Sequence, residues 1–233
     1  MLHYSQDYLD NFIVRYGYDS NAIEGNKLTF EQSKEIILHE KIVNNSDKVR
    51  AISVFDCYEA ANQKDAFYTM LDFVKYDRQM SVDIILSLHY QLTKNTLSTA
   101  GHFKTSDNYI LGTDFKTASV FDTPFKIKEW VNNTNYLLAN SENDDIFIEN
   151  LIKSHILFER IHPFDDGNGR TGRELINFEL AKRELPFLDI KLTDRNDYMG
   201  FENKQDYQSL TKLAQERMKE EKEIYLKSQT IDN

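Results

Sequence analysis

The sequence has few of the residues that break helices. Its 233 residues include only 8 glycines and 3 prolines, and both residue types end or bend helices. Long stretches run without either, which predicts an all-α fold. Hydrophobic residues make up 40% of the chain, with 15 Phe and 13 Tyr, and this is enough apolar surface for a packed interior. A chain of this length has room for one substantial core with a small helical appendage.

The sequence has one cysteine, Cys57, so an internal disulfide is excluded. Its neighbours Val54, Phe55 and Tyr58 favour a buried structural thiol over a nucleophile. We therefore expect no chemical role for this residue.

The sequence also lacks a long run of lysine and arginine, and acidic residues exceed basic ones by 38 to 28. Because contacts to phosphates dominate nucleic-acid affinity, a nucleic-acid partner is disfavoured. The first residues lack the basic and apolar parts of a signal peptide. No stretch approaches the roughly 20 apolar residues that span a bilayer. The sequence predicts a cytoplasmic protein with no membrane partner.

Apolar residues at helical spacing predict a bundle of helices. The first helix covers 7–24 and ends at Gly25, which suits a left-handed cap. Thr29 is an N-cap signal for a second helix, with Gln32 three residues later. Ser81 caps another helix. Further helices are expected from residue 47, over 127–137, 144–159 and 174–185, and from residue 205 onward.

The segment 101–124 lacks helical periodicity and mixes short apolar runs with Gly112, Asp114 and several threonines. This pattern favours a short β-hairpin. We expect three parts in the chain, namely N-terminal helices (1–45), a core (46–200) and a C-terminal helix packed on the core (201–233).

The segment 162–173, HPFDDGNGRTGR, gathers a histidine, two carboxylates, three glycines and two arginines between two apolar helices. Gly167 and Gly169 can adopt the positive φ angles that let backbone N–H groups converge on an anion. The helix that follows adds its positive end. Arg170 and Arg173 are three residues apart, so both can face this cradle and bind phosphate oxygens.

Two further residues of this segment fit phosphate chemistry. Asp166, beside a polyphosphate, is suited to bind Mg²⁺, which takes one or two carboxylates together with phosphate oxygens. His162 can accept a proton near neutral pH and so activate a hydroxyl. The segment therefore predicts phosphoryl or nucleotidyl transfer. The alternative is a structural loop in which the arginines pair with Asp165, Asp166 or Glu174 and His162 caps a helix.

This ordered set resembles the signature of the Fic family, His-x-Phe-x-Asp/Glu-Gly-Asn-Gly-Arg-x-x-Arg, and matches it at every fixed position. The resemblance extends over about residues 86–198. It implies a helical Fic fold in which the motif loop binds ATP and a hairpin flap, here around Tyr109, Ile110 and Leu111, docks the target protein.

The resemblance also implies roles for individual residues. His162 would deprotonate a Ser, Thr or Tyr hydroxyl of the target, and Asp166 would hold Mg²⁺ or Mn²⁺. The ATP-binding residues would be Phe164, which anchors the loop, Gly167, Asn168 and Gly169 at the α- and β-phosphates, Arg170 at the β-phosphate and Arg173 at the γ-phosphate. Doc-like kinases of the superfamily carry Lys at the position of Gly169, so this glycine favours AMP transfer.

Ser20 and Glu24 lie four residues apart near the end of the first predicted helix, on one face of it. With the motif present, the segment 20–25 resembles the family's inhibitory Ser/Thr-x-x-x-Glu-Gly/Asn motif of class II members. The resemblance implies that Glu24 pairs with Arg173 and takes the place of the γ-phosphate.

The sequence thus predicts an autoinhibited protein adenylyltransferase whose partners are ATP and a target hydroxyl, with self-modification as a default. The alternatives are transfer of another group such as UMP or phosphocholine, removal of AMP from a modified protein, and a silent nucleotide-binding regulatory module. The charge-rich segment 212–227 leaves homo-oligomerisation open.

Overall fold

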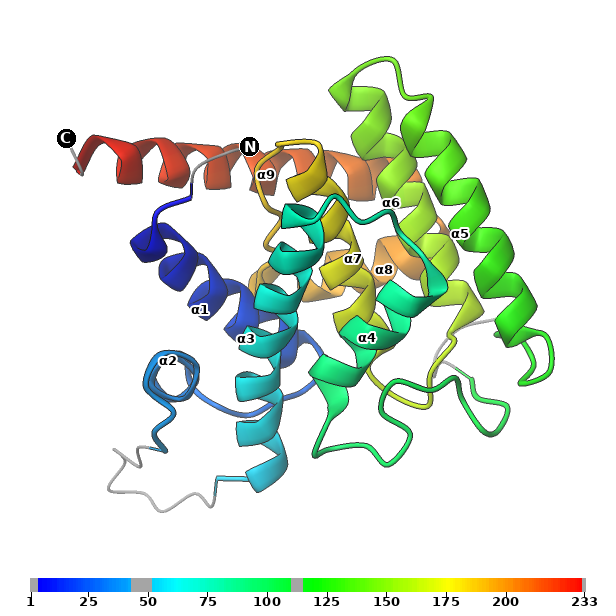
Figure 1. Ribbon diagram of the computed structural model, residues 1–233, viewed down its shortest axis with the longest axis horizontal. Coiled ribbons are helices and arrows are strands. Elements are labelled where there is room, and N and C mark those ends of the chain that lie inside the picture. Colours follow the sequence, from blue (N-terminus) through cyan, green and yellow to red (C-terminus); the bar gives the residue numbers. More distant parts are fainter. Residues whose placement is uncertain (1–3, 43–51, 110–114, 232–233) are drawn as a thin grey trace.

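The computed structural model describes residues 4–42, 52–109 and 115–231, and these form a bundle of helices (Figure 1). The described ranges contain no β-strand, and one short 3₁₀ turn, η1, precedes α8. The elements are α1 (Gln6–Ile23), α2 (Phe30–His39), α3 (Val54–Lys75), α4 (Val82–Thr93), α5 (Thr123–Ala139), α6 (Asp144–Ile161), α7 (Asn168–Lys182), η1 (Leu192–Asp194), α8 (Arg195–Lys204) and α9 (Tyr207–Ile231). The predicted all-α fold is confirmed.

Polar residues cap the starts of several helices as expected. Thr29 and Gln32 form a complete capping box at α2, and the Ser81 side chain accepts the backbone N–H of Ile84 at α4. The turn after α1 contains Gly25 at φ +99°, a region that favours glycine. These signals are local, and the helix boundaries that they predict at Gly25, Thr29 and Ser81 lie within a few residues of the observed ones.

The structure differs from the predicted helices at three places. The helix expected from residue 47 begins at Val54, and residues 43–51 lie outside the described part. The helix expected over 174–185 is α7, which begins at Asn168 because the motif turn is completed at Gly167. Helix α8 was not predicted, because its sequence RNDYMGFENK is polar and Tyr198 is its one buried residue.

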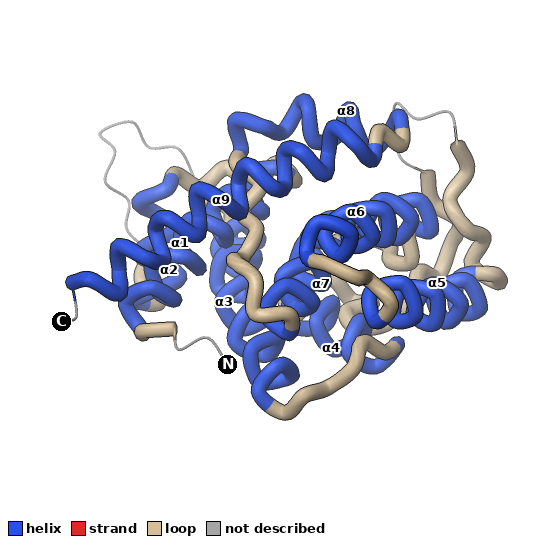
Figure 2. Tube along the Cα trace, turned by 90° about the horizontal axis from the view of Figure 1, so that it is seen from above, coloured by secondary structure: helices blue, strands red, loops and turns tan. Residues whose placement is uncertain are grey.

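Helix α7 runs through the centre of the bundle and packs against α3, α4 and α6 (Figure 1). Nearly all of its side chains are buried, including both motif arginines. One apolar cluster joins it to α1, α3 and α4, with Phe12, Phe67 and Phe187 at its middle. A second cluster joins α6 and α7 to α9, which lies along one side of the bundle (Figure 2). The site-bearing end of α7 is therefore held from several sides.

The predicted β-hairpin is not found in the described flanks of segment 101–124, and Ile110 and Leu111 lie outside the described residues. The two arms meet through side chains, since Thr117 Oγ1 donates to the Asn108 carbonyl and the Val120 N–H donates to Asp107 Oδ1. Backbone N–H groups of both arms also form hydrogen bonds outside the flap. The N–H groups of residues 104 and 118 donate to the carbonyls of residues 163 and 161, so both arms are fixed to the motif loop.

The helices within the described ranges include none that is long and apolar enough to cross a membrane. The boundaries of the three predicted parts of the chain stay a prediction.

Candidate active site

His162 ends α6 and begins the motif loop. Its backbone is left-handed, with φ 52° and ψ 63°, and its N–H donates to the Phe158 carbonyl. The ring Nδ1 lies 3.3 Å from the Glu159 carbonyl oxygen. Because a carbonyl can only accept, Nδ1 carries the hydrogen and Nε2 is left to take a proton. Burial lowers the pKa of His162 below its ordinary value, so the ring is neutral and basic near pH 7.

The loop after His162 is closed by Asn168. Its side chain accepts the Phe164 N–H at 2.9 Å and donates to the Phe164 carbonyl at 3.0 Å. Gly167 has φ +79°, and a Cβ there would lie 2.8 Å from Thr93 Cγ2. The Phe164 ring is fully buried, as the anchoring role requires. Backbone geometry and packing therefore both demand glycine at position 167.

The motif loop and the start of α7 line a cavity of about 190 Å³. Other walls come from the end of α1, the end of α6, Phe115 and α8. The lining includes Ile23, Glu24, Phe115, Glu159, Arg160, His162, Asp165, Asp166, Gly167, Asn168, Gly169, Arg173, Tyr198, Met199, Glu202 and Asn203. The structure thus brings together the base, the glycine cradle, the second arginine and the N-terminal glutamate that the sequence singled out.

Arg173 is 3% exposed and is held by the end of α1. Its guanidinium donates to Ser20 Oγ at 3.0 Å, to the Ser20 carbonyl at 3.0 Å and to Glu24 Oε1 at 2.7 Å. Burial opposes the charge on Arg173, but the Glu24 carboxylate beside it raises its pKa above the ordinary value. The expected pair between Glu24 and Arg173 is present.

Glu24 also covers Gly169. A Cβ on Gly169 would lie 2.2 Å from Glu24 Oε1, so the carboxylate occupies the space directly above the glycine cradle. The Glu24 side chain is 37% exposed, and it reaches the cavity from outside the motif. A phosphate group on Arg173 and the Glu24 carboxylate would compete for the same guanidinium.

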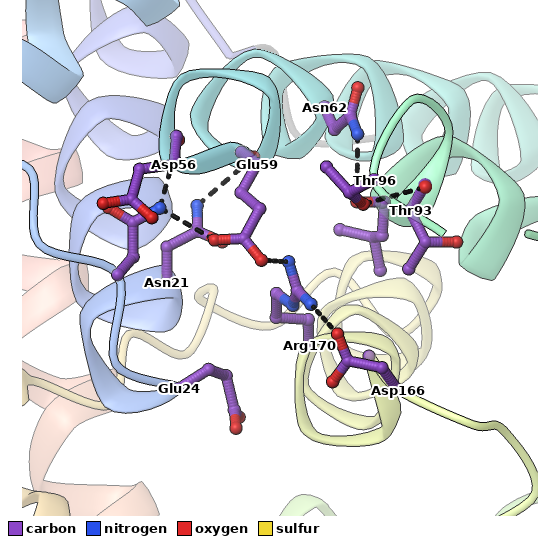
Figure 3. A network of polar contacts seen from close by, with 12 residues as sticks. Asn21, Glu24, Asp56, Glu59, Asn62, Thr93, Thr96, Asp166 and Arg170 are labelled. Carbon is purple, nitrogen blue, oxygen red and sulfur yellow. Dashed lines mark hydrogen bonds and ion pairs between the residues drawn. The ribbon is translucent and has the colours of Figure 1, made fainter. Parts of the chain in front are cut away.

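Arg170 lies between Glu59 and Asp166 (Figure 3). It is 1% exposed and is absent from the described lining of the cavity. One of its terminal nitrogens donates to Glu59 Oε1 of α3 at 2.8 Å, and the other donates to Asp166 Oδ2 at 3.2 Å. The role at the β-phosphate therefore stays a prediction, and in this structure Arg170 orients Asp166.

Asp166 fits a divalent cation only together with a bound nucleotide. Its side chain is 68% exposed at the edge of the cavity, beside the cradle. The described residues contain no group of three His, Cys, Asp or Glu side chains that could hold a metal. One carboxylate with phosphate oxygens is, however, a usual arrangement for Mg²⁺. Asp166 would hold the ion, and the phosphates would supply the other ligands.

Two contacts of the structural alternative are absent. Asp165 accepts from Thr99 Oγ1 and from the Thr105 N–H rather than from an arginine. Glu174 is buried and accepts from Tyr16 and Gln63. The third pairing expected for a structural loop, between Arg170 and Asp166, does occur.

His89 and Glu59 belong to the site but were not predicted to do so. The His89 ring stacks on Phe164, with centroids 3.7 Å apart and planes at 2°. It also lies 3.0 Å from the Asp166 carbonyl and accepts the Gly101 N–H. No sequence signal marked Glu59, which lies 111 residues from its partner Arg170.

Helix α8 builds a further wall of the cavity. Tyr198 is fully buried, and its hydroxyl lies 2.7 Å from His155 Nε2, which also lies 2.8 Å from Glu202 Oε1. Arg173 packs over the Tyr198 ring at 5.8 Å. This wall and the glycine cradle together line the cavity.

Comparisons with known proteins agree with this geometry. Residues 79–180 match the family model described as Fic/DOC family. The motif loop, all of α6 and most of α7 lie within that match.

Two relatives are named protein adenylyltransferases. The protein adenylyltransferase Fic of Nematostella vectensis is 26% identical over 192 residues, which cover 82% of this chain and 42% of the relative. The protein adenylyltransferase fic-1 of Caenorhabditis elegans is 28% identical over 185 residues, which cover 78% of this chain and 34% of the relative. The chain thus spans less than half the length of either relative.

Solved structures share the fold. A Fic domain containing signaling protein from Bacteroides thetaiotaomicron has a TM-score of 0.75 at 26% identity, covering 84% of this chain and 73% of its own. Fic-1 from C. elegans has a TM-score of 0.74 at 21% identity, covering 99% of this chain and 68% of its own.

Proposed function

We propose that this chain is a protein adenylyltransferase that moves AMP from ATP onto a hydroxyl of a protein and is restrained by Glu24. The observation that carries the proposal is the position of Arg173 and His162 on one cavity, with Glu24 bound to the arginine. A structural loop has no need of a neutral, half-buried histidine on the same cavity as a glycine turn and a buried arginine. The relatives named as adenylyltransferases support the same reaction class.

In the proposed reaction His162 Nε2 takes the proton of the incoming hydroxyl. The hydroxyl oxygen then bonds to the α-phosphorus of ATP, and the bond from this phosphorus to the bridging oxygen of pyrophosphate breaks. The N–H groups around Gly167 and Gly169 hold the phosphate oxygens, and Arg173 takes the γ-phosphate once Glu24 has left it. A divalent ion at Asp166 would offset the charge on pyrophosphate.

Glu24 restrains this reaction through competition. Its carboxylate pairs with Arg173 at 2.7 Å and lies over Gly169. Bound ATP would have to displace it or adopt a pose in which the γ-phosphate is unsupported. The resting enzyme is therefore expected to be slow.

Removal of AMP is the second candidate, because Glu24 lies on the same cavity as His162 and is 37% exposed. A carboxylate in that position can orient water toward the phosphorus of a modified hydroxyl. Incubating AMP-modified target with the parent protein tests this activity. Transfer of UMP or phosphocholine is tested by replacing ATP with the corresponding donors.

The test of the main proposal is intact-mass analysis after incubation with ATP and Mg²⁺, with and without a cell extract from which modified targets are recovered. The proteins are the parent, Glu24→Gly, and Glu24→Gly with His162→Ala. We expect adenylyl mass with Glu24→Gly and none with the double variant. Glu40→Gly is the matched control, because Glu40 is also a helix C-cap, at φ 56°, but lies in α2 away from the cavity.

Two results would contradict the proposal. Adenylyl mass that persists after His162→Ala would remove the base from the mechanism. No transfer to any protein by Glu24→Gly, with intact nucleotide binding, would favour the silent nucleotide-binding module. Self-modification, a homo-oligomer and a cytoplasmic location remain predictions of the sequence.

A further inference from the structure

The turn that presents Glu24 is attached to α3 by the residue that follows Gly25. The Asn26 side-chain amide donates to Glu59 Oε2 at 2.8 Å and to the Asp56 carbonyl at 3.1 Å. Asn26 Oδ1 accepts the Leu28 N–H at 3.0 Å, so the amide group can present only its NH₂ to α3. We call these bonds from Asn26 to α3 the Asn26 tether.

The carboxylate that receives the tether is itself fixed by the catalytic motif. Glu59 Oε1 accepts a hydrogen bond from Arg170 at 2.8 Å, and Arg170 also donates to Asp166 (Figure 3). The two oxygens of Glu59 therefore join the N-terminal turn to the first turn of α7. Because Arg170 is 1% exposed, this pairing is shielded from solvent and holds Glu59 in one position.

We propose that Glu59 is a positioning residue for inhibition, which holds Glu24 on Arg173 through the Asn26 tether. This inference rests on the proposed function, since it concerns how the restraint of that same site is set. Glu59 does not line the described cavity, and it acts through Asn26 on one side and through Arg170 on the other.

The position of Glu24 depends on its backbone, because its side chain has few contacts of its own. Its carboxylate pairs with Arg173, and the side chain is 37% exposed. Gly25 beside it has nothing within 4 Å of an added Cβ, so packing does not support the turn there. The turn is anchored before Glu24 by Arg195, which donates to the Ile23 carbonyl at 2.7 Å, and after it by Asn26. The Lys27 N–H also donates to Asp56 Oδ2 of α3, at 3.2 Å. Loss of the tether would therefore weaken the attachment of this side without removing it.

The same arrangement links nucleotide binding to release. A phosphate that attracts Arg170 would draw the guanidinium away from Glu59, and Glu59 would then hold Asn26 less firmly. By thermodynamic linkage, weakening the tether must in turn favour nucleotide binding. The Asn26 tether thus couples the pair between Glu59 and Arg170 to the pair between Glu24 and Arg173.

The test is a double-mutant cycle between Asn26→Ala and Glu24→Gly. Asn26→Ala should raise transfer by about threefold to tenfold, which corresponds to the loss of one hydrogen bond, and the rate should stay below that of Glu24→Gly. In the Glu24→Gly background, Asn26→Ala should change the rate by less than about twofold, because no inhibitory carboxylate is left to release. Asn140→Ala is the matched control, since Asn140 is an exposed helix-end asparagine remote from the cavity.

A second variant and a second readout keep the proposal independent of transfer. Glu59→Gln retains an acceptor for Arg170 but turns an NH₂ group toward the NH₂ of Asn26, so it should also raise transfer in the parent. Amide hydrogen exchange over residues 24–28 should be faster in both variants than in the parent. Thermal unfolding of each variant checks that the fold is intact.

The outcomes separate this inference from the proposed function. Equal gains from Asn26→Ala with and without Glu24 would overturn the inference, because Asn26 would then act on catalysis directly. Unchanged exchange and unchanged transfer would overturn it as well. Absence of transfer in Glu24→Gly would count against the proposed function alone, while exchange at residues 24–28 would still decide whether the tether exists.

Discussion

His162 adopts a backbone conformation that few side chains accept. A non-glycine residue in the left-handed region costs of the order of 1 kcal/mol or more, and such residues cluster at functional sites. The conformation ends α6 and lets the chain turn at once into the motif loop. At the residue scale, the site is therefore built by a few positions whose geometry is determined by their immediate neighbours.

The pH dependence of transfer should reflect the environment of His162. Burial lowers its pKa below the ordinary 6.5, so the neutral, proton-accepting form persists to lower pH than for a free histidine. In the Glu24→Gly variant, the rate should fall on acidification with a midpoint below 6.5. Rates measured at saturating ATP from pH 5 to 8 check this. A midpoint at or above 6.5 would mean that another group limits the reaction.

His89 should be required for the shape of the loop. Burial lowers the pKa of His89 to about 4, so the ring is neutral, with Nε2–H donating to the Asp166 carbonyl and Nδ1 accepting from Gly101. His89→Ala removes both bonds and the stacking on Phe164. We expect at least tenfold weaker binding of a non-hydrolysable ATP analogue in the Glu24→Gly background, measured by calorimetry. His39→Ala, at an exposed position on α2, is the control, and equal affinity in both variants would contradict the prediction.

At the scale of elements, α1 is held between the motif helix and the C-terminal helix. Ser20 and Glu24 at its C-terminal end contact Arg173, and Arg15 contacts Glu221 of α9. Helix α9 passes beside α1 in Figure 2. Arg15 donates twice to Glu221, at 2.9 and 3.1 Å, and lies 3.6 Å from Asp189. Helix α1 thus depends on α9 for its position.

Removing Glu221 should cost stability. Glu221→Ala breaks a bidentate pair whose carboxylate is 3% exposed and whose arginine is 22% exposed. Because the arginine is partly solvated, we expect a loss of about 1–3 kcal/mol in the free energy of unfolding, below the range for a fully buried pair. Urea unfolding followed by circular dichroism measures it. Lys153→Ala breaks an exposed pair with Glu149 and should cost less than about 0.5 kcal/mol. Equal losses in the two variants would show that the Glu221 pair stabilises the fold no more than an exposed pair does.

At the scale of the whole molecule, the fold buries carboxyl groups away from the cavity. Burial raises the pKa of Glu174 to about 8, of Asp189 to about 8 and of Glu179 to about 7. These groups keep their protons in the folded chain at pH values where the unfolded chain has lost them. Their contribution to stability is therefore complete below the ordinary values of 3.8 and 4.5, and it is lost as the pH rises through about 7 to 8.

The melting temperature should accordingly fall between pH 6 and pH 9. Asp189→Asn cannot ionise, so its melting temperature should fall less over the same range than that of the parent. Calorimetric scans at several pH values give both slopes. Identical slopes for the two proteins would show that Asp189 is ionised in the folded state throughout.

The sequence by itself determined the features that depend on neighbours within a few residues. The capping box at Thr29, the cap at Ser81, the glycine turn after α1 and the motif loop are all local, because backbone angles and short-range hydrogen bonds set them. The pairing of Glu24 with Arg173 was also predicted, but from the family resemblance rather than from the residues.

Only the tertiary structure decided the contacts between distant residues. Glu59 reaches Arg170 across 111 residues, and His89 reaches the Asp166 carbonyl across 77. In the described parts of the flap, the backbone N–H groups of residues 104 and 118 pair with the carbonyls of residues 163 and 161, and the polar helix α8 forms where Tyr198 can be buried. These outcomes depend on which surfaces the packed helices bring together, and periodicity along one segment carries no information about its partners.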